Sequence, residues 1–284
     1  MTPKPATRSS DLVLATVLTH NDPEALAGCL AAIARQTRRP DAVLVIDNGS
    51  SPLARAAVDR LAGESCATVL RLSANLGPAG GHAAGLRAFL AGPCDVAWVM
   101  DDDCVPEPDC LQAILSAREA QDRDGVLFPA QTDEVGVERN WPGWFAVLVP
   151  RAVVDRVGVP REEFFWWAED TEYLQWRIPR AGFPLQWVAG ARVQHRRRQA
   201  TGPKPAWKVY YEARNSVYYR LRVQRPFQRP LRIQKVSRLT RALSRTLWSL
   251  ITESHDRRNR LRMFARGIFD GLRGRLGRTV VPEA

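Results

Sequence analysis

Three consecutive aspartates, Asp101, Asp102 and Asp103, are the residues whose types and spacing most directly suggest chemistry. They follow the apolar run Asp95–Met100, which is typical of a buried strand. Side chains alternate along an extended chain, so Asp101 and Asp103 point the same way while Asp102 faces elsewhere. Two carboxylates on one side can hold a single divalent cation. An acidic turn with helix-capping aspartates is the alternative, and the position directly after a strand favours the metal site.

Glu169, Asp170 and His195 are further candidates. The two acids follow four aromatic residues, Phe164–Trp167. In an aromatic pocket a carboxylate suits general-base catalysis because desolvation raises its pKa, but the same pair also suits the N-terminal cap of a helix. His195 ends a predicted strand just before Arg196–Arg198. An isolated histidine is more often structural; joined to two carboxylates, it would favour Mn²⁺ without excluding Mg²⁺.

The elements that must position these groups alternate between strands and helices. Short apolar runs predict strands over Leu12–Thr19, Ala42–Ile46, Thr68–Leu72, Asp95–Met100, Phe145–Val149, Leu185–Val188 and Ala191–Gln194. Caps and helical periodicity predict helices after Asp22 and Glu169 and over Pro52–Leu61, Ala79–Leu90, Pro108–Gln121, Trp207–Arg225 and Pro230–Gly274, with turns before Trp144. Such a pattern indicates an α/β fold with a largely parallel sheet, in which ligands bind beyond the carboxyl ends of the strands.

The net charge of +11 on 284 residues is unevenly distributed. Residues 1–189 carry 17 basic and 25 acidic side chains, whereas residues 190–284 carry 24 basic and 5 acidic ones. We therefore expect a catalytic domain over 1–205 and a basic helical region over 206–284 that faces an anionic partner. The composition is that of a globular protein, with no apolar run long enough for a membrane helix and no secretory signal. Five cysteines without a CxxC pair fit a reducing cytoplasm.

Several other functions fit the residues less well. The glycine-bearing segment Asn75–Gly81 has neither the dinucleotide-binding nor the P-loop spacing. A sugar-phosphate nucleotidyltransferase would need a glycine-rich basic loop after Leu12–Thr19, which is absent. A nucleic-acid-binding protein would explain the basic region but would leave the acidic residues without a purpose.

Taken together, the motifs resemble glycosyltransferase family 2, whose members have the GT-A fold. The resemblance covers about residues 12–220 and rests on the strand leaving Thr19-His20-Asn21, VIDNGSS (Val45–Ser51), NLGPAGG (Asn75–Gly81), WVMDDD (Trp98–Asp103), WWAEDTEY (Trp166–Tyr173), GARVQH (Gly190–His195) and YYEARNSVYY (Tyr210–Tyr219). Within the family the chain is most similar to bacterial galactofuranosyl- and rhamnosyltransferases of cell-wall glycan synthesis. The Arg214-Asn215 pair leans towards the galactofuranosyl branch, as do two of the other motifs.

The resemblance implies an inverting, metal-dependent transfer of a sugar from a nucleotide-sugar donor. It implies roles for individual residues: catalytic Asp170 with Glu169 beside it; sugar-donor-binding Thr19, Asp47, Asn75 and Asp102; and Mn²⁺- or Mg²⁺-binding Asp101, Asp103 and His195. Aromatic rings also suit the C–H faces of sugars, so Trp144, Trp166 and Trp167 are candidates for acceptor binding, with core packing as the alternative. Close relatives often have two aspartates where this chain has Glu169-Asp170, which weakens any inference about which sugar is transferred.

The resemblance and the charge together indicate the partners. We expect a UDP- or dTDP-linked sugar donor, a glycan or polyprenyl-diphosphate-linked acceptor, and no nucleic acid. The run Arg232–Ile251 mixes leucines with arginine and lysine, as interfacial helices do. We therefore expect a cytoplasmic enzyme held peripherally on the anionic cytoplasmic face of the cell membrane; the alternative is a solvated helical cap that packs on the catalytic domain.

Overall fold

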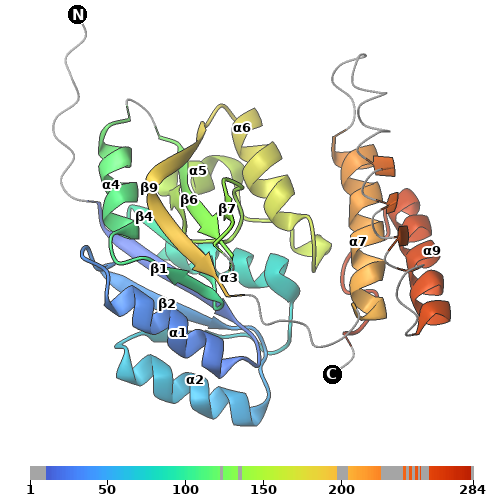
Figure 1. Ribbon diagram of the computed structural model, residues 1–284, viewed down its shortest axis with the longest axis horizontal. Coiled ribbons are helices and arrows are strands. Elements are labelled where there is room, and N and C mark those ends of the chain that lie inside the picture. Colours follow the sequence, from blue (N-terminus) through green and yellow to red (C-terminus); the bar gives the residue numbers. More distant parts are fainter. Residues whose placement is uncertain are drawn as a thin grey trace, which may run out of the picture.

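The computed structural model of the protein describes residues 11–121, 124–133, 136–196, 204–224, 239–240, 243–244, 247–248, 250 and 256–282. A mixed β-sheet with helices on both faces forms the body of the molecule, and helices α7 and α9 lie side by side next to it (Figure 1). The predicted α/β class is therefore confirmed.

Parallel strands form the first half of the sheet, in the spatial order β3 (Thr68–Arg71), β2 (Ala42–Asp47), β1 (Val13–Thr19) and β4 (Val96–Asp101). Their registers place Thr19 opposite Asp47 and Leu18 opposite Asp101. The polar residues that end these strands thus meet at one edge of the sheet, as the strand–helix alternation predicts.

Strand directions are mixed in the second half of the sheet. The order continues with β8 (Val147–Pro150), β6 (Val126–Thr132), β9 (Leu185–His195) and β5 (Cys104–Pro106), while β7 (Glu138–Arg139) pairs with β6. Strand β8 runs antiparallel to β4, and β9 pairs antiparallel with β5, so that Cys104 lies opposite His195. Because Cys104 follows Asp103 directly, this last pairing brings His195 to the side of Asp103.

Two expectations for this half of the sheet were wrong. The two short strands predicted within 185–194 are one continuous strand, β9. Strand β6 was missed and a turn-rich stretch expected, because Pro129 argues against a central strand. The structure accommodates Pro129 at an irregularity, where the register against β9 shifts between Pro129 and Ala130.

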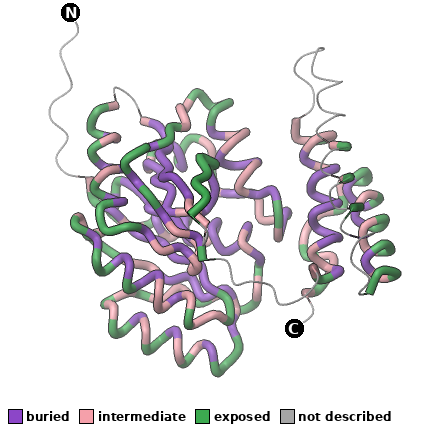
Figure 2. Tube along the Cα trace, in the orientation of Figure 1, coloured by how far each residue is buried: buried purple, intermediate pink, exposed green. Residues whose placement is uncertain are grey.

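Apolar side chains bury both faces of the sheet, and most of the strand residues are buried (Figure 2). One face is covered by α1 (Pro23–Ala34), α2 (Pro52–Glu64) and α4 (Cys110–Glu119). The other is covered by α3 (Gly77–Ala91), α5 (Arg151–Val157), the π-helix η2 (Thr171–Arg177) and α6 (Ile178–Arg180). Because β1 and β4 are buried on both sides, their sequences are continuous apolar runs, which made them easy to predict.

Helices α7 (Ala206–Tyr218) and α9 (Arg257–Arg273) pack closely through two glycines of α9. A Cβ at Gly267 would lie 2.4 Å from the carbonyl oxygen of Tyr210, and one at Gly271 would lie 2.5 Å from that of Arg214. The π-helix η3 (Tyr219–Val223) prolongs α7, as the predicted helix over 207–225 requires. Most of the predicted interfacial run over 232–251 lies outside the described residues. No helix in the described ranges is long and apolar enough to cross a membrane.

Candidate functional site

The acidic triplet lies at the carboxyl edge of the parallel strands, where the sequence predicts a ligand site. The Thr19 hydroxyl donates a hydrogen bond to Asp102 Oδ2 at 2.6 Å, so the ends of β1 and β4 are tied together. Burial raises the pKa of Asp102 well above its ordinary value, although the Thr19 hydrogen bond opposes this rise. Of the sugar-donor-binding predictions, Thr19 and Asp102 thus form one connected pair.

Asp101 is paired with a histidine that sequence reasoning missed. His82 on α3 is buried, and its Nε2 lies 2.9 Å from Asp101 Oδ1, while its ring stacks on the Trp144 indole with centroids 4.4 Å apart. Burial lowers the pKa of His82 to about 3, only partly offset by the charge of Asp170, so the ring is neutral. Beside an ionised Asp101, the tautomer that makes this hydrogen bond is the one with the proton on Nε2. A polar residue among the small apolar residues that begin α3 was the available signal.

Asp103 lies against His195, the third predicted metal ligand. His195 Nε2 is 2.9 Å from Asp103 Oδ2, and its Nδ1 is 2.6 Å from the amide nitrogen of Gln131 on β6. Asp103 Oδ1 is buried without a hydrogen-bond partner, although the groups around it are polar. A buried carboxylate oxygen without a partner is costly unless a cation compensates it.

The donor set fits a divalent cation. Two carboxylates and one imidazole suit Mn²⁺ or Mg²⁺, and the partnerless Asp103 Oδ1 is an available oxygen ligand. For His195 Nε2 to act as a ligand, its proton must move to Nδ1, and Gln131 must then present its amide oxygen instead of its nitrogen. In the part of the chain that the structure describes, no three His, Cys, Asp or Glu side chains are already grouped as an ion site.

Burial raises the pKa of both Glu169 and Asp170, the candidate catalytic acids. Glu169 is 5% exposed and its Oε2 has no hydrogen-bond partner. Asp170 is partly exposed; its Oδ1 accepts hydrogen bonds from the backbone N–H of Thr171 at 2.6 Å and from the Thr171 hydroxyl at 3.2 Å. Asp170 thus makes the capping contact that the sequence offered as one alternative, while its carboxylate stays partly accessible.

The Asp170 carboxylate lies within electrostatic reach of the acidic triplet. Burial raises the pKa of Asp101 well above its ordinary value, and the charges of Asp103 and Asp170 add to the rise while His195 opposes it. Residues separated by some seventy positions in the chain thus share one electrostatic environment. The fold brings a candidate base to a candidate metal site.

Two predicted sugar-donor-binding residues are used largely within the protein. The Asp47 carboxylate is fully buried and accepts hydrogen bonds from the Ser50 backbone N–H and the Arg71 guanidinium, each at 3.0 Å. Burial raises the pKa of Asp47, but these hydrogen bonds outweigh it and leave the pKa below its ordinary value. Asn75 Oδ1 accepts from the Gly77 backbone N–H at 2.8 Å, which shapes the turn before α3.

Asn48, which the sequence marked as part of the VIDNGSS motif after β2 without a role of its own, links these two segments. Its Oδ1 accepts from the Leu76 backbone N–H at 2.9 Å, and its Nδ2 donates to the Gly77 carbonyl at 3.1 Å. The end of β2 and the start of α3 are therefore held as one wall of the site.

The three predicted acceptor-binding tryptophans differ in exposure. Trp144 is 3% exposed and supports His82, so its burial argues against the predicted acceptor contact. Trp167 is 47% exposed and Trp166 partly exposed, with their ring centroids 5.6 Å apart. Trp207 on α7 packs edge-on against Trp166 at 5.4 Å, which extends the aromatic surface beyond the predicted pair.

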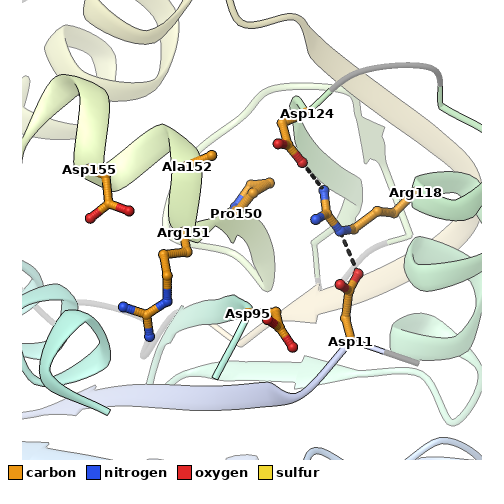
Figure 3. A pocket seen from close by; sticks show the side chains of 8 residues that line it. All are labelled: Asp11, Asp95, Arg118, Asp124, Pro150, Arg151, Ala152 and Asp155. Atoms are coloured by element: carbon orange, nitrogen blue, oxygen red, sulfur yellow. Dashed lines mark hydrogen bonds and ion pairs between the residues drawn. The ribbon is translucent and has the colours of Figure 1, made fainter. Parts of the chain in front are cut away.

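A cavity of about 450 Å³ lies at the opposite edge of the sheet, among residues before β1 and β4 and around the start of α5 (Figure 3). Arg118 bridges Asp11 and Asp124 there, at 2.6 and 2.9 Å. Nearby Arg151 donates to backbone carbonyls, including Cys94 O at 2.7 Å. Both arginines are thus engaged within the protein, and none of the predicted site residues lines this cavity.

Comparison with known proteins places the chain in a family. A model of the family described as glycosyl transferase family 2 matches residues 15–187. The chain is 30% identical over 208 residues to galactofuranosyltransferase GlfT1 of Mycolicibacterium smegmatis, which covers 62% of this chain and 68% of the relative. It is 26% identical over 249 residues to the N-acetylglucosaminyl-diphospho-decaprenol L-rhamnosyltransferase of Mycobacterium tuberculosis, which covers 69% and 80%.

A solved structure shares the fold. The mannosyltransferase PcManGT from Pyrobaculum calidifontis, in complex with GDP-Man and Mn²⁺, superposes with a TM-score of 0.62 at 14% identity. The superposition covers 95% of this chain and 90% of that one. At this identity the likeness supports the fold alone.

The buried Glu169 carboxyl leads to a prediction for stability. Its pKa lies well above the ordinary 4.5, so the native state holds its proton more tightly than the unfolded state does. Ionisation therefore costs stability as pH rises above about 4.5, and the cost persists at neutral pH. Glu169→Gln, which cannot ionise, should raise the melting temperature at pH 7 and leave it nearly unchanged at pH 4. Thermal unfolding followed by circular dichroism checks this. The prediction is contradicted if the difference in melting temperature between the variant and the natural protein is lower at pH 7 than at pH 4.

Proposed function

The chain belongs to glycosyltransferase family 2, and from this premise we propose that it transfers galactofuranose or rhamnose, with inversion, from a nucleotide sugar to a glycan or lipid-linked glycan. The observation that carries this proposal is the meeting of Asp170 with the acidic triplet at the carboxyl ends of β1 and β4. Such a site joins a base to a place for a diphosphate and its cation, which is what a single displacement at an anomeric carbon needs.

Asp170 is the proposed base. Its partly exposed carboxylate takes the proton of the acceptor hydroxyl as that oxygen bonds to the anomeric carbon. The bond from this carbon to the diphosphate oxygen breaks at the same time, so one displacement inverts the configuration. Burial supports the role, because the raised pKa of Asp170 makes its carboxylate a stronger base than an exposed aspartate. Glu169, which is more deeply buried, is assigned to orienting the sugar.

Asp101, Asp103 and His195 are the proposed ligands of a divalent cation, Mn²⁺ or Mg²⁺. When bound, the cation would stabilise the negative charge that develops on the leaving nucleoside diphosphate. The partnerless Asp103 Oδ1 and the position of His195 beside Asp103 support this assignment. His82 holds Asp101 by its Nε2 hydrogen bond and thereby fixes the direction of that carboxylate.

Thr19, Asp47, Asn75 and Asp102 remain the proposed residues of the sugar-donor site, with Asp102 reaching the donor directly, the buried Thr19 holding Asp102, and Asp47 and Asn75 shaping the wall. The donor is proposed to be UDP- or dTDP-linked. The names of the two curated relatives support galactofuranose and rhamnose, and the name of the second supports a polyprenyl-diphosphate-linked acceptor. Trp166 and Trp167 offer rings against which a sugar face can stack.

The C-terminal helices are proposed to hold the enzyme on the anionic cytoplasmic face of the membrane. The outward face of α9 exposes the apolar residues Leu261, Phe269 and Leu272, at 40%, 49% and 49%. Arginines alternate with them, including the exposed Arg258 and Arg262. A face that combines basic and apolar side chains favours the boundary of an anionic lipid surface.

Asp170→Asn should slow transfer severely while the protein still binds its nucleotide. Loss of the base is expected to lower kcat by about 10²- to 10⁴-fold. The affinity for the nucleoside diphosphate, measured by calorimetry, should stay within about twofold, because Asp170 contacts the acceptor rather than the nucleotide. Weakened nucleotide binding together with a kcat close to that of the natural protein would overturn the assignment.

Asp103→Asn should weaken Mn²⁺ binding, because it replaces an anionic ligand by a neutral one. We expect at least about tenfold lower affinity, since even outer partners of metal ligands change affinity by 10- to 100-fold. Titration of Mn²⁺ followed by electron paramagnetic resonance measures this without any assay of activity. Asp155→Asn, at the opposite edge of the sheet, is the matched control, and equal affinity in all three proteins would refute the metal site.

Arg258→Gln combined with Arg262→Gln should weaken binding to phosphatidylglycerol vesicles. Each basic residue near an anionic surface contributes about 1 kcal/mol, so losing two predicts roughly 30-fold weaker binding. The same change at the body residues Arg60 and Arg156 is the control. Cosedimentation that falls equally in both variants, or in neither, would reject a membrane role for α9.

A further inference from the structure

The loop that carries Glu169 and Asp170 has an unusual backbone. Phe165 has φ 62° and ψ −67°, and the Trp166 backbone N–H donates to the Phe164 carbonyl at 2.7 Å, which together make a γ-turn with positive φ. Trp167 and Ala168 also have positive φ, at 76° and 69°. Positive φ is unfavourable for residues with a side chain, so the surrounding structure must hold this loop in place.

Two side chains of α7 supply the holding contacts. Asn215 Nδ2 lies within hydrogen-bond distance of three loop carbonyls, those of Phe164 at 2.9 Å, Trp166 at 2.7 Å and Trp167 at 2.8 Å. Arg214 Nη2 donates to the Phe164 carbonyl at 2.8 Å. Both side chains are fully buried. The loop carbonyls that have no partner in a regular helix or strand are thus paired with side chains of one helix, α7.

Arg214 and Asn215 are themselves fixed by the C-terminal region. Arg214 Nε donates to Asn215 Oδ1 at 2.8 Å, and Nη1 donates to the Gly277 carbonyl at 2.6 Å and to Thr279 Oγ1 at 3.1 Å. The guanidinium lies 4.6 Å from the centroid of the Tyr211 ring. Residues after α9 therefore orient the two side chains that reach the loop.

The opposite side of the loop rests on the start of α3. A Cβ at Gly77 would lie 1.9 Å from the Phe165 carbonyl oxygen, so only glycine allows this approach. The same oxygen accepts from the Ala79 backbone N–H at 3.3 Å. The loop is thus held between the segment proposed to lie near the sugar donor and helix α7.

We propose that Arg214 and Asn215 are positioning residues of the reaction: they hold the strained loop over 164–168 in the one conformation that directs Glu169 and Asp170 at the site. The C-terminal helices are then part of the catalytic unit, whatever they do at a membrane. This inference rests on the proposed function for the role of Asp170, but the holding of the loop can be measured separately.

A role in packing alone would have different consequences. Substituting a residue that only packs α7 should lower stability and leave the turnover of the folded enzyme unchanged. Val217 provides this comparison, because it lies two positions along α7, is 2% exposed, and faces Gly271 of α9 rather than the loop.

The test compares Asn215→Ala, Arg214→Lys and Val217→Ala in the full chain by hydrogen exchange and kinetics. Asn215→Ala should speed amide exchange over 163–170 while α9 stays protected, and it should lower kcat by about 10²-fold, the cost of a 1 Å misplacement. The affinity for the nucleoside diphosphate should stay within about twofold. Arg214→Lys keeps the charge but loses the two-pronged guanidinium, and it should show a smaller change of the same kind. It decides the test if Asn215→Ala does not fold.

A double variant adds a readout that packing would not move. If Asn215 acts through Asp170, adding Asn215→Ala to Asp170→Asn should lower kcat little beyond Asp170→Asn alone. Unchanged amide exchange over 163–170 in Asn215→Ala would show that Asn215 does not hold the loop. Faster exchange there with unchanged kcat would overturn the positioning role. Equal loss of kcat in folded Val217→Ala would do the same. Absence of transfer by the natural protein would overturn the proposed function instead, while hydrogen exchange would still decide whether the loop is held.

Discussion

Carboxylates crowded at one edge of a sheet repel one another, and burial deprives them of water. Asp101, Asp102, Asp103 and Glu169 all face this cost, which is visible as the raised pKa of Asp101, Asp102 and Glu169. Neighbouring polar groups offset part of it: His82 and Thr19 donate to Asp101 and Asp102, and His195 lies against Asp103. Asp103 Oδ1 and Glu169 Oε2 still have no partner, and a cation and a sugar would supply what they lack. The protein folds despite this cost, and bound ligands would offset what remains of it.

The second constraint is the strained loop between the aromatic run and Asp170. Its shape depends on Gly77 on one side and on Asn215 on the other. The start of α3, the proposed base Asp170 and the C-terminal helices are therefore structurally coupled. This changes how membrane binding can be tested. A chain truncated at Pro205 would lose Arg214 and Asn215 along with the basic surface, so loss of activity would say nothing about lipid. Neutralising surface arginines on α9 separates the two effects.

Local sequence patterns predicted the parallel half of the sheet, because buried parallel strands are continuous apolar runs, and with it the gathering of the polar residues that follow those strands, such as Asp47 and Asp101. Contacts across long sequence separations were beyond such patterns. The pairing of His82 with Asp101 joins two elements, and Asn215 reaches carbonyls up to 51 residues earlier in the chain. The motif resemblance singled out Arg214-Asn215 without giving a physical reason, and the loop carbonyls supply one. Roles assigned to Asp47, Asn75 and Trp144 by resemblance were not predictable in detail, since only the structure shows that their side chains are occupied or covered.

We propose that Asp170, on the loop held by Asn215, and the acidic triplet Asp101–Asp103 together perform one inverting displacement on a nucleotide sugar. The most direct measurement incubates the purified protein with Mn²⁺, a short glycan acceptor and UDP-, GDP- or dTDP-linked sugars, and determines the anomeric configuration of the product by NMR. The account predicts acceptor-dependent release of nucleoside diphosphate from UDP-galactofuranose or dTDP-rhamnose, with the configuration opposite to that of the donor. A product that retains the configuration of its donor would contradict it.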